Sequence, residues 1–397
     1  MTDRRQFLGG LGALGALEAL TALGGGAWLM ASPQLAWAAA PDYRRLLVLV
    51  ELKGGNDGLN TIIPIADPAY PVLRPRLALK RDEVLLLDER TGAHPSLAPL
   101  QALWQARELA VVQSVGYPQA NLSHFRSIEI WDTASRADQY LGDGWLGRVF
   151  AANPPPAGFA ADGVAVGSAD MGPLAGTGAR AVAITRSEQF EKMARLAQPR
   201  AEQGSGALRH LLKVEEDVSA AASRLVGAHA FRTTFPSGPF GDAVRTACQI
   251  VASGSGVAAL RLTLSGFDTH QNQPGTHANL LRQLADGLVA LRAGLSEIGR
   301  WNETLVMTYG EFGRRPQENQ SNGTDHGTAA PHFVLGGKIA GGLYGEAPRL
   351  SQRDGNGNLP FAVDFRSLYA TVLERWWNLP STPVLGGRFE PLPLIRA

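Results

Sequence analysis

Short runs of apolar, often β-branched residues recur along the chain, and such runs are typical of buried strands. We expect strands at 45–51, 109–115, 163–167, 180–185, 258–265, 303–309 and 332–336. Between these runs the apolar residues change to a helical spacing, as in the leucines from Leu280 to Leu295. This spacing predicts helices at 95–107, 122–135, 187–197, 206–226, 239–252, 275–299 and 365–378.

The alternation of strands and helices predicts the fold class. A strand, a helix and a second strand in succession usually give parallel neighbours with helices on both faces of the sheet. We therefore predict an α/β fold of three layers, α/β/α, around a mostly parallel mixed sheet. Residues 137–240 are less regular and include Pro154-Pro155-Pro156, so we expect an insertion or cap at the sheet edge.

Polar clusters follow four of the predicted strands, either directly or after a short loop. In open α/β sheets, ligands bind outside the carboxyl ends of the strands, so these clusters are expected to converge in one crevice. Five of the eight histidines, at positions 124, 270, 277, 326 and 332, lie in or beside these clusters or the later Asp325-His326 pair. The four clusters are Lys53-Gly54-Gly55-Asn56-Asp57, Asn121-Leu122-Ser123-His124-Phe125-Arg126, Gly266-Phe267-Asp268-Thr269-His270 and Gly310-Glu311-Phe312-Gly313-Arg314.

The first 38 residues have the pattern of an export signal. Asp3-Arg4-Arg5-Gln6-Phe7-Leu8 matches the twin-arginine pattern, an apolar stretch runs to Met30, and Ala36-Trp37-Ala38 is a small-x-small cleavage site. The alternative is a membrane anchor, because the stretch is long enough to span a bilayer. The paired arginines and the cleavage site favour removal, export through the twin-arginine machinery, and a periplasmic or secreted mature chain without stable membrane insertion.

Composition narrows the function classes. The 397 residues are 45% hydrophobic and 18% charged, with a net charge of +1. A large core is therefore available, and nothing in the charge favours a nucleic-acid partner. Cys248 is the only cysteine, so there is no disulfide framework and no thiolate metal cluster. It lies in a helical apolar pattern, which favours a core position.

Two carboxylates in these clusters are candidate metal ligands with ordinary alternatives. Asp57 offers a hard oxygen between glycines that let the backbone approach a ligand closely, although Asn-Asp-Gly is also common in turns. Glu311 follows a strand closely, and its alternative is a solvated loop with a local Glu-Arg pair.

Ser123 and Arg126 are the candidate catalytic residues. Ser123 opens a predicted helix, where it either caps the helix or acts as a nucleophile beside free amides that stabilise an anion. Arg126 lies one turn into the helix and could reach the same anion. Arg314 and Lys53 are further candidates for substrate contact.

Asp268, His270 and His326 complete the predicted metal ligands. Asp268 and His270 are two residues apart and share a side if the chain stays extended. An oxygen and a nitrogen ligand suit zinc or manganese, and without thiols magnesium or calcium also fit. A plain Asp-His hydrogen bond is the alternative. The roles of His277, Asp325 and His332 stay open.

Nearly the whole mature chain resembles domain-of-unknown-function family 1501, twin-arginine-exported proteins related in fold to the alkaline phosphatase and sulfatase superfamily. The resemblance implies an alkaline-phosphatase-like domain over 41–397. It also implies that Asp57 binds metal, that Ser123 takes the phosphoryl group, and that Asp268 and His270 hold one metal. His326, followed by Pro331, matches the superfamily's last histidine. The matching motifs are Gly54-Gly55-Asn56-Asp57-Gly58-Leu59-Asn60-Thr61, Ser123-His124-Phe125, Phe267-Asp268-Thr269-His270, Gly310-Glu311-Phe312-Gly313-Arg314 and Asp325-His326-Gly327.

The chain departs from the superfamily pattern at two positions. Only Thr269 separates Asp268 from His270, where the superfamily usually has three residues, so His277 could substitute for His270. Phe312 stands where the superfamily has a ligand histidine, and a second metal then lacks a nitrogen ligand unless Asp325 or His332 supplies one. No sulfatase modification motif is present around Ser123, which disfavours sulfate esters.

These observations lead to two hypotheses. The first is an exported metal-dependent hydrolase of a small phosphate or related oxyanion ester, in which Asp57 and Glu311 hold one cation and Asp268, His270 and His326 another. Ser123 attacks in this hypothesis, and Arg126 clamps the anion. The second is a non-catalytic periplasmic protein that keeps the fold and at most one structural metal.

Overall fold

The computed structural model describes residues 40–185, 225 and 229–396. All of these residues belong to Ala39–Ala397, one of the two compact units of the chain. The expected signal at 1–38 lies outside the described residues, as do the expected helix at 187–197 and that at 206–226 except for Leu225.

A mixed sheet forms the centre of the described unit. Neighbouring strands run parallel except β12, which is antiparallel to both of its neighbours. The predicted α/β class with a mostly parallel mixed sheet is confirmed. Within the described residues the sheet has nine strands, in the order β13 (Gly342–Tyr344), β5 (Leu109–Gly116), β12 (Ala330–Leu335), β9 (Thr304–Tyr309), β1 (Leu46–Lys53), β8 (Val257–Ser265), β6 (Ala161–Val166) and β7 (Ala181–Ile184), and β14 (Val363–Asp364) pairs with β5.

The central strand β1 shows why the sequence forms this sheet. Its sequence is apolar at every position from Leu46 to Val50, and all of these residues are buried. A strand covered on both faces needs such a continuous apolar run. Alternate side chains enter two different cores, so Val48 and Val50 pack on one face while Leu47 and Leu49 pack on the other. Both faces must therefore be covered by other elements.

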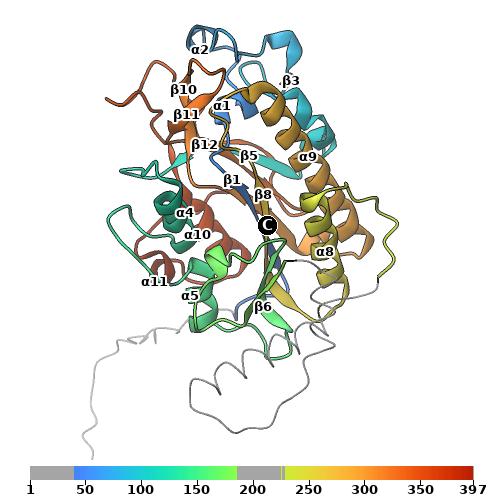
Figure 1. Ribbon diagram of the computed structural model, residues 1–397. Helices are drawn as coiled ribbons and strands as arrows, with labels where there is room; N and C mark the ends of the chain where they lie inside the picture. Colours follow the sequence, from blue (N-terminus) through green and yellow to red (C-terminus); the bar gives the residue numbers. More distant parts are fainter. Residues whose placement is uncertain (1–39, 186–224, 226–228, 397) are drawn as a thin grey trace, which may run out of the picture. The chain divides into compact units, whose positions relative to one another are not determined.

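Helices cover the two faces of the sheet, which confirms the predicted three layers (Figure 1). Helices α8 and α9, with the turns before β5, pack on one face, and α4, α5 and α10 pack on the other. Cys248 is buried in α8. The first group is α8 (Pro239–Ala252), α9 (Gln273–Glu297), η2 (Pro95–Leu100) and α3 (Gln101–Gln105); the second is α4 (His124–Thr133), α5 (Trp145–Ala152), α10 (Phe365–Ala370), its π-helical continuation η5 (Thr371–Trp376) and α11 (Thr382–Leu385).

Smaller elements extend the carboxyl edge of the sheet, where the loops after β1, β5, β8 and β9 lie. The antiparallel pair β10 and β11 follows β9, with Arg314 opposite His326. A second small sheet has the order β2-β4-β3. These elements are β10 (Gly313–Glu318), β11 (Thr324–Gly327), β2 (Ile62–Ile63), β4 (Gly92–Ala93), β3 (Leu85–Leu86), α1 (Gly58–Thr61), α2 (Ala69–Leu73) and η1 (Arg81–Glu83). Two further short helices lie elsewhere: η3 (Gly172–Leu174) follows β6, and η4 (Trp301–Glu303) directly precedes β9.

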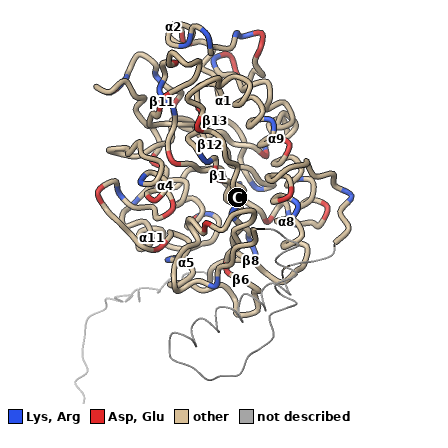
Figure 2. Tube along the Cα trace, viewed as in Figure 1, with Lys and Arg blue, Asp and Glu red and all other residues tan. Residues whose placement is uncertain are grey.

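The segment expected as an insertion or cap contributes α5, β6 and the edge strand β7 to the described unit. Acidic and basic residues are interspersed along the described chain (Figure 2). Among the described residues, no helix has both the length and the apolar character needed to cross a bilayer.

Candidate metal centre

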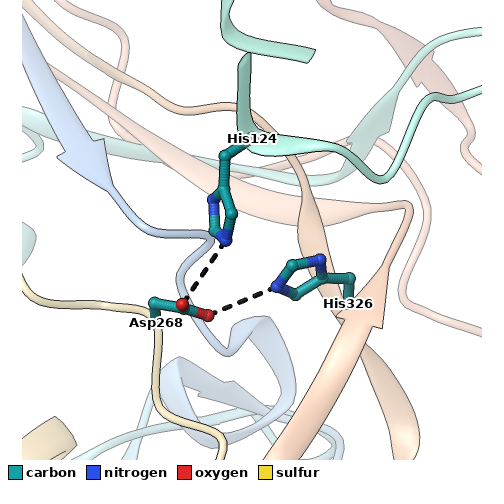
Figure 3. A group of neighbouring side chains, drawn as sticks. All are labelled: His124, Asp268 and His326. Carbon is teal, nitrogen blue, oxygen red and sulfur yellow. Dashed lines mark hydrogen bonds and ion pairs between the residues drawn. The ribbon is translucent and has the colours of Figure 1, made fainter. Parts of the chain in front are cut away.

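Three side chains from distant parts of the sequence meet at the carboxyl edge of the sheet. Ligand atoms of His124, Asp268 and His326 all lie within 4.8 Å of one another, and within the described residues this is the group that can hold a metal ion. Figure 3 shows both imidazole rings directed at the Asp268 carboxylate. Asp268 is 46% exposed and His124 is 36% exposed, so small molecules can reach the group from solvent.

The topology of the sheet brings these three residues together. Asp268 lies in the loop just after β8, and His124 is the first residue of α4, which follows β5. His326 lies on β11, opposite Arg314 on β10. Strands β5, β8 and β9, which precede these three residues along the chain, end at the same edge of the central sheet, as expected for ligand sites in α/β folds.

A backbone carbonyl sets the proton position on His326. Its Nδ1 lies 2.8 Å from the carbonyl oxygen of Leu122. A carbonyl only accepts hydrogen bonds, so Nδ1 carries the proton in the neutral ring and Nε2 is the unprotonated nitrogen. Burial lowers the pKa of His326 below its usual value, although the Leu122 carbonyl and Asp268 oppose this. His326 is therefore a neutral nitrogen donor near pH 7.

A buried carboxylate sets the proton position on His124 in the same way. Its Nδ1 lies 2.8 Å from Oε1 of Glu311, so it donates to that oxygen. The same Oε1 accepts the N–H of Gly54 at 3.0 Å. Glu311 is 2% exposed, and its Oε2 has no hydrogen-bond partner. The structure thus places Glu311 behind His124 as an orienting group, with the His124 Nε2 directed at Asp268.

Arg314 donates a hydrogen bond to one oxygen of Asp268, and the other oxygen faces His124. The Arg314 Nη2 lies 2.7 Å from Asp268 Oδ1, whereas Oδ2 lies 3.4 Å from the His124 Nε2. Partial burial raises the pKa of Asp268, but the hydrogen bond and charge of Arg314 outweigh it and hold the pKa below its usual value. Asp268 is therefore ionised at neutral pH.

His270 borders the group on the side away from His124. Its Nε2 lies 3.0 Å from both Asp268 Oδ1 and His326 Nε2. Its Nδ1 lies 3.4 Å from a carboxylate oxygen of Asp325. The structure therefore brings together three of the predicted metal ligands, Asp268, His270 and His326, and places the fourth, Glu311, behind His124.

Phe312 packs against the two metal-facing histidines. Its ring centroid lies 5.0 Å from that of His124 and 4.4 Å from that of His326. The backbone of Gly55, at φ +78°, passes so close that an added Cβ would lie 2.5 Å from this ring. Only glycine fits both the backbone angle and the space. Phe312 thus holds the imidazoles in place as an apolar neighbour.

Asp57, the fifth predicted ligand, lies outside this group. Both of its oxygens accept hydrogen bonds from Arg74, at 2.6 Å and 2.9 Å, and Gln273 also donates to it. Burial would raise the pKa of Asp57, but Arg74 outweighs it and keeps the pKa low. In the structure Asp57 is therefore the counter-ion of a buried arginine.

The two predicted catalytic residues have different environments. Ser123 is exposed at the N-cap of α4, and its side chain makes no capping hydrogen bond. Arg126 is 9% exposed and its Nη2 donates to the carbonyls of Arg136, Ala137 and Gln139. It also pairs with Glu129. The structure leaves the Ser123 hydroxyl free, whereas it places the Arg126 guanidinium against the loop after α4.

His277 and His332, whose roles the sequence left open, are buried away from the group. The His277 Nε2 lies 2.9 Å from the side-chain oxygen of Asn56. The His332 Nδ1 lies 3.3 Å from the Thr308 hydroxyl. Both rings are part of the packed interior beneath the loops.

A sequence model described as "Protein of unknown function (DUF1501)" matches residues 89–386. The chain belongs to the DUF1501 family. The matched segment includes all three residues of the group in Figure 3. No curated protein sequence matches this DUF1501 chain.

The DUF1501 chain is similar to several solved structures at low identity. Lipoteichoic acid synthase LtaP from Listeria monocytogenes is 10% identical over 77% of this chain and 68% of that chain, with a TM-score of 0.35. The C-terminal periplasmic domain of EcEptC from Escherichia coli, in complex with Zn, is 9% identical over 74% and 72%, with a TM-score of 0.37. Alkaline phosphatase from the Antarctic bacterium TAB5 is 12% identical over 77% and 95%, with a TM-score of 0.30. All three TM-scores are below 0.5, so chemistry is inferred from the side chains of this chain alone.

His124 is the residue that the sequence-based assignment missed. It lies in one of the polar clusters that follow predicted strands, between Ser123 and Arg126, the two residues predicted to be catalytic. The first turn of a helix presents successive residues to different sides, and the local pattern does not show which side meets the site. The available signal was that His124 belongs to the set of histidines that follow strand ends.

The buried histidines make the stability of the fold depend on pH. Burial lowers the pKa of His277 and of His332 to about 4, whereas both titrate near about 6.5 in an unfolded chain. Between these values the unfolded chain binds more protons, so stability is full above about pH 6.5 and is lost as the pH falls toward 4. Each histidine should contribute about 2 kcal/mol to the loss between pH 7.5 and 5.0.

Denaturant unfolding of wild type and His332→Gln at these two pH values measures this contribution. The variant should lose less stability on acidification than wild type. The exposed His229 offers a matched control, since His229→Gln should keep the wild-type dependence. Equal pH dependence in wild type and His332→Gln would contradict the assignment.

Proposed function

We propose that this DUF1501 protein is a metal-dependent hydrolase of phosphate or related oxyanion esters. The observation that carries the proposal is the convergence of His124, Asp268 and His326 within 4.8 Å at a solvent-accessible strand edge. The support comes from the donor atoms of these three side chains.

The donor atoms of the group fit a divalent cation. The Nε2 of His124 and an oxygen of the ionised Asp268 face each other at 3.4 Å, although both act as acceptors when Nδ1 carries the imidazole proton. The Nε2 of His326 faces the other Asp268 oxygen at 3.3 Å. Two acceptors that face one another repel unless a proton or a metal cation lies between them. Two imidazole nitrogens and a carboxylate oxygen suit zinc or manganese best.

His124, Asp268 and His326 would hold this cation, with His270 as an adjacent donor. When bound, the cation supplies Lewis-acid stabilisation of the negative charge that develops on the ester's oxygens. Glu311 and the Leu122 carbonyl keep the proton on the Nδ1 of His124 and of His326, respectively, so that the Nε2 of each ring is available to a cation.

Ser123 is the proposed nucleophile. Its neighbours on both sides touch the site, because the carbonyl of Leu122 accepts from His326 and the side chain of His124 faces Asp268. Its hydroxyl has no capping role. The first-turn amides of a helix lack intrahelical partners and favour an anion beside them. In the proposed step the Ser123 oxygen attacks phosphorus, the alcohol leaves with a proton, and water then releases phosphate.

Export through the twin-arginine route is part of the proposal. It is supported by Arg4-Arg5, the apolar stretch that ends near Met30, and the Ala36-Trp37-Ala38 site. The mature domain would then act in the periplasm or outside the cell, on a small ester.

Metal content and ester turnover of the purified protein test the proposed function. We expect one divalent ion per chain and hydrolysis of aryl phosphate or phosphodiester substrates. Ser123→Ala should keep the ion and lose at least about 10³-fold in kcat. Ser296→Ala, an exposed serine in the last turn of α9, is the matched control and should keep wild-type activity.

Two outcomes would count against this function in different ways. Hydrolysis that survives in Ser123→Ala with bound metal would overturn the role of Ser123. Protein that binds no metal and hydrolyses none of the aryl phosphate, phosphodiester and sulfate substrates would instead support the non-catalytic alternative.

The carboxylate behind His124 gives a second prediction for the same site. Glu311→Gln keeps the size of the side chain but can no longer offer a charged acceptor to the His124 Nδ1. Loss of such an outer carboxylate typically weakens metal binding by about 10- to 100-fold. Competition with a chromophoric chelator measures this change. Glu303→Gln, at an exposed glutamate before β9, should leave the affinity unchanged, and unchanged affinity in Glu311→Gln would remove Glu311 from the site.

A further inference from the structure

The proposed substrates carry negative charge, and the sequence indicates three cationic residues as candidates to contact that charge. Two of them already make hydrogen bonds and ion pairs within the protein. Arg126 donates to loop carbonyls and pairs with Glu129. Arg314 is 2% exposed and donates to backbone carbonyls and to Asp268. The third is Lys53.

Lys53 has a fixed backbone at the edge of the sheet that carries the metal centre. It is the last residue of β1, and its carbonyl accepts the N–H groups of Gly266 and Phe267, which lead to Asp268. The next residue, Gly54, donates its N–H to Glu311. The Lys53 backbone is thus joined by hydrogen bonds to the loop that carries Asp268 and, through Gly54, to the group that orients His124.

The side chain of Lys53 emerges on the face of the sheet that α4 covers. Alternation along a strand puts it on the same side as Glu51, Leu49 and Leu47, and the two leucines pack in the core that includes residues of α4. His124 begins α4. The Lys53 ammonium and the proposed substrate site are therefore on one face.

Glu51, the nearest acid along the strand, does not neutralise Lys53. One oxygen of Glu51 accepts from Arg261 at 2.7 Å and from Thr263 at 2.9 Å. Burial raises the pKa of Glu51 and Arg261 opposes it, with smaller effects from the Lys53 ammonium and the Glu311 carboxylate. Both of those groups therefore lie within electrostatic range of Glu51. Lys53 itself is exposed and has no ion pair among the described residues.

We propose that Lys53 is the specificity-determining cation that contacts the charged oxygens of the ester. This inference rests on the proposed function and names its substrate class as anionic esters rather than neutral ones. A lysine ammonium is a compact charge on a flexible chain, so it can follow a phosphate group without a fixed geometry. Because it is exposed, its attraction for an anion should weaken as salt is added.

Lys53→Met removes the charge and keeps most of the side-chain length, whereas Lys53→Arg keeps the charge. In Lys53→Met we expect kcat/KM for an aryl phosphate to fall by about 10- to 100-fold, mainly through KM. Its dependence on ionic strength should also become shallower. Turnover of a neutral aryl carboxylate ester and the metal content should stay within about twofold of wild type, and Lys53→Arg should stay close to wild type on both esters.

Lys338→Met is the matched control. Lys338 is exposed three residues after β12, at the opposite edge of the sheet, and its variant should behave as wild type.

Calorimetric titration with inorganic phosphate provides a readout that needs no turnover, and Lys53→Met should bind phosphate about 10-fold or more weakly. A wild-type protein that hydrolyses none of the esters would contradict the proposed function. The phosphate titration would still test whether Lys53 binds the anion. Equal phosphate affinity in wild type and Lys53→Met would overturn the inference.

Discussion

The guanidinium group of Arg314 holds together the loops that carry the candidate metal ligands. It donates to the carbonyls of Gly54 and Gly55 after β1, to that of Phe267 after β8, and to that of Thr324 on β11. It also donates to Asp268 itself. A buried cation is tolerated only when its donors are satisfied. These loops must therefore keep their carbonyls directed at one point, and the side chains of Asp268 and His326 are positioned as a consequence.

The same arrangement gives the two oxygens of the Asp268 carboxylate different partners. Arg314 takes one oxygen and leaves the other facing the His124 Nε2. On the far side of each ring, the Leu122 carbonyl accepts a hydrogen bond from the Nδ1–H of His326, and the Glu311 carboxylate accepts one from the Nδ1–H of His124. Donors that are oriented before a ligand arrives lose less entropy on binding it. The centre is thus organised by hydrogen bonds that belong to the fold.

The local spacing of apolar residues predicted the strands and helices well, but the residues of the site only in part. The strands were predictable because continuous apolar runs identify a sheet buried on both faces, and α8 begins and ends where its apolar spacing predicted. Strand ends also marked Asp268 and Glu311 as site residues. The pairing of Asp57 with Arg74 joins residues seventeen positions apart, with α1, β2 and α2 between them, and the local spacing of apolar residues does not predict such a contact. Likewise the sequence does not show that Glu311 lies one layer behind His124, since that depends on how α4 docks against the loop after β9.

The most direct test of this account is a crystal structure of the protein grown with zinc, with anomalous scattering data. The account predicts one strong peak at roughly 2.0–2.2 Å from the Nε2 atoms of His124 and His326 and from an oxygen of Asp268. An absence of anomalous density at this point, with Asp268 hydrogen-bonded directly to a protonated His124, would contradict it.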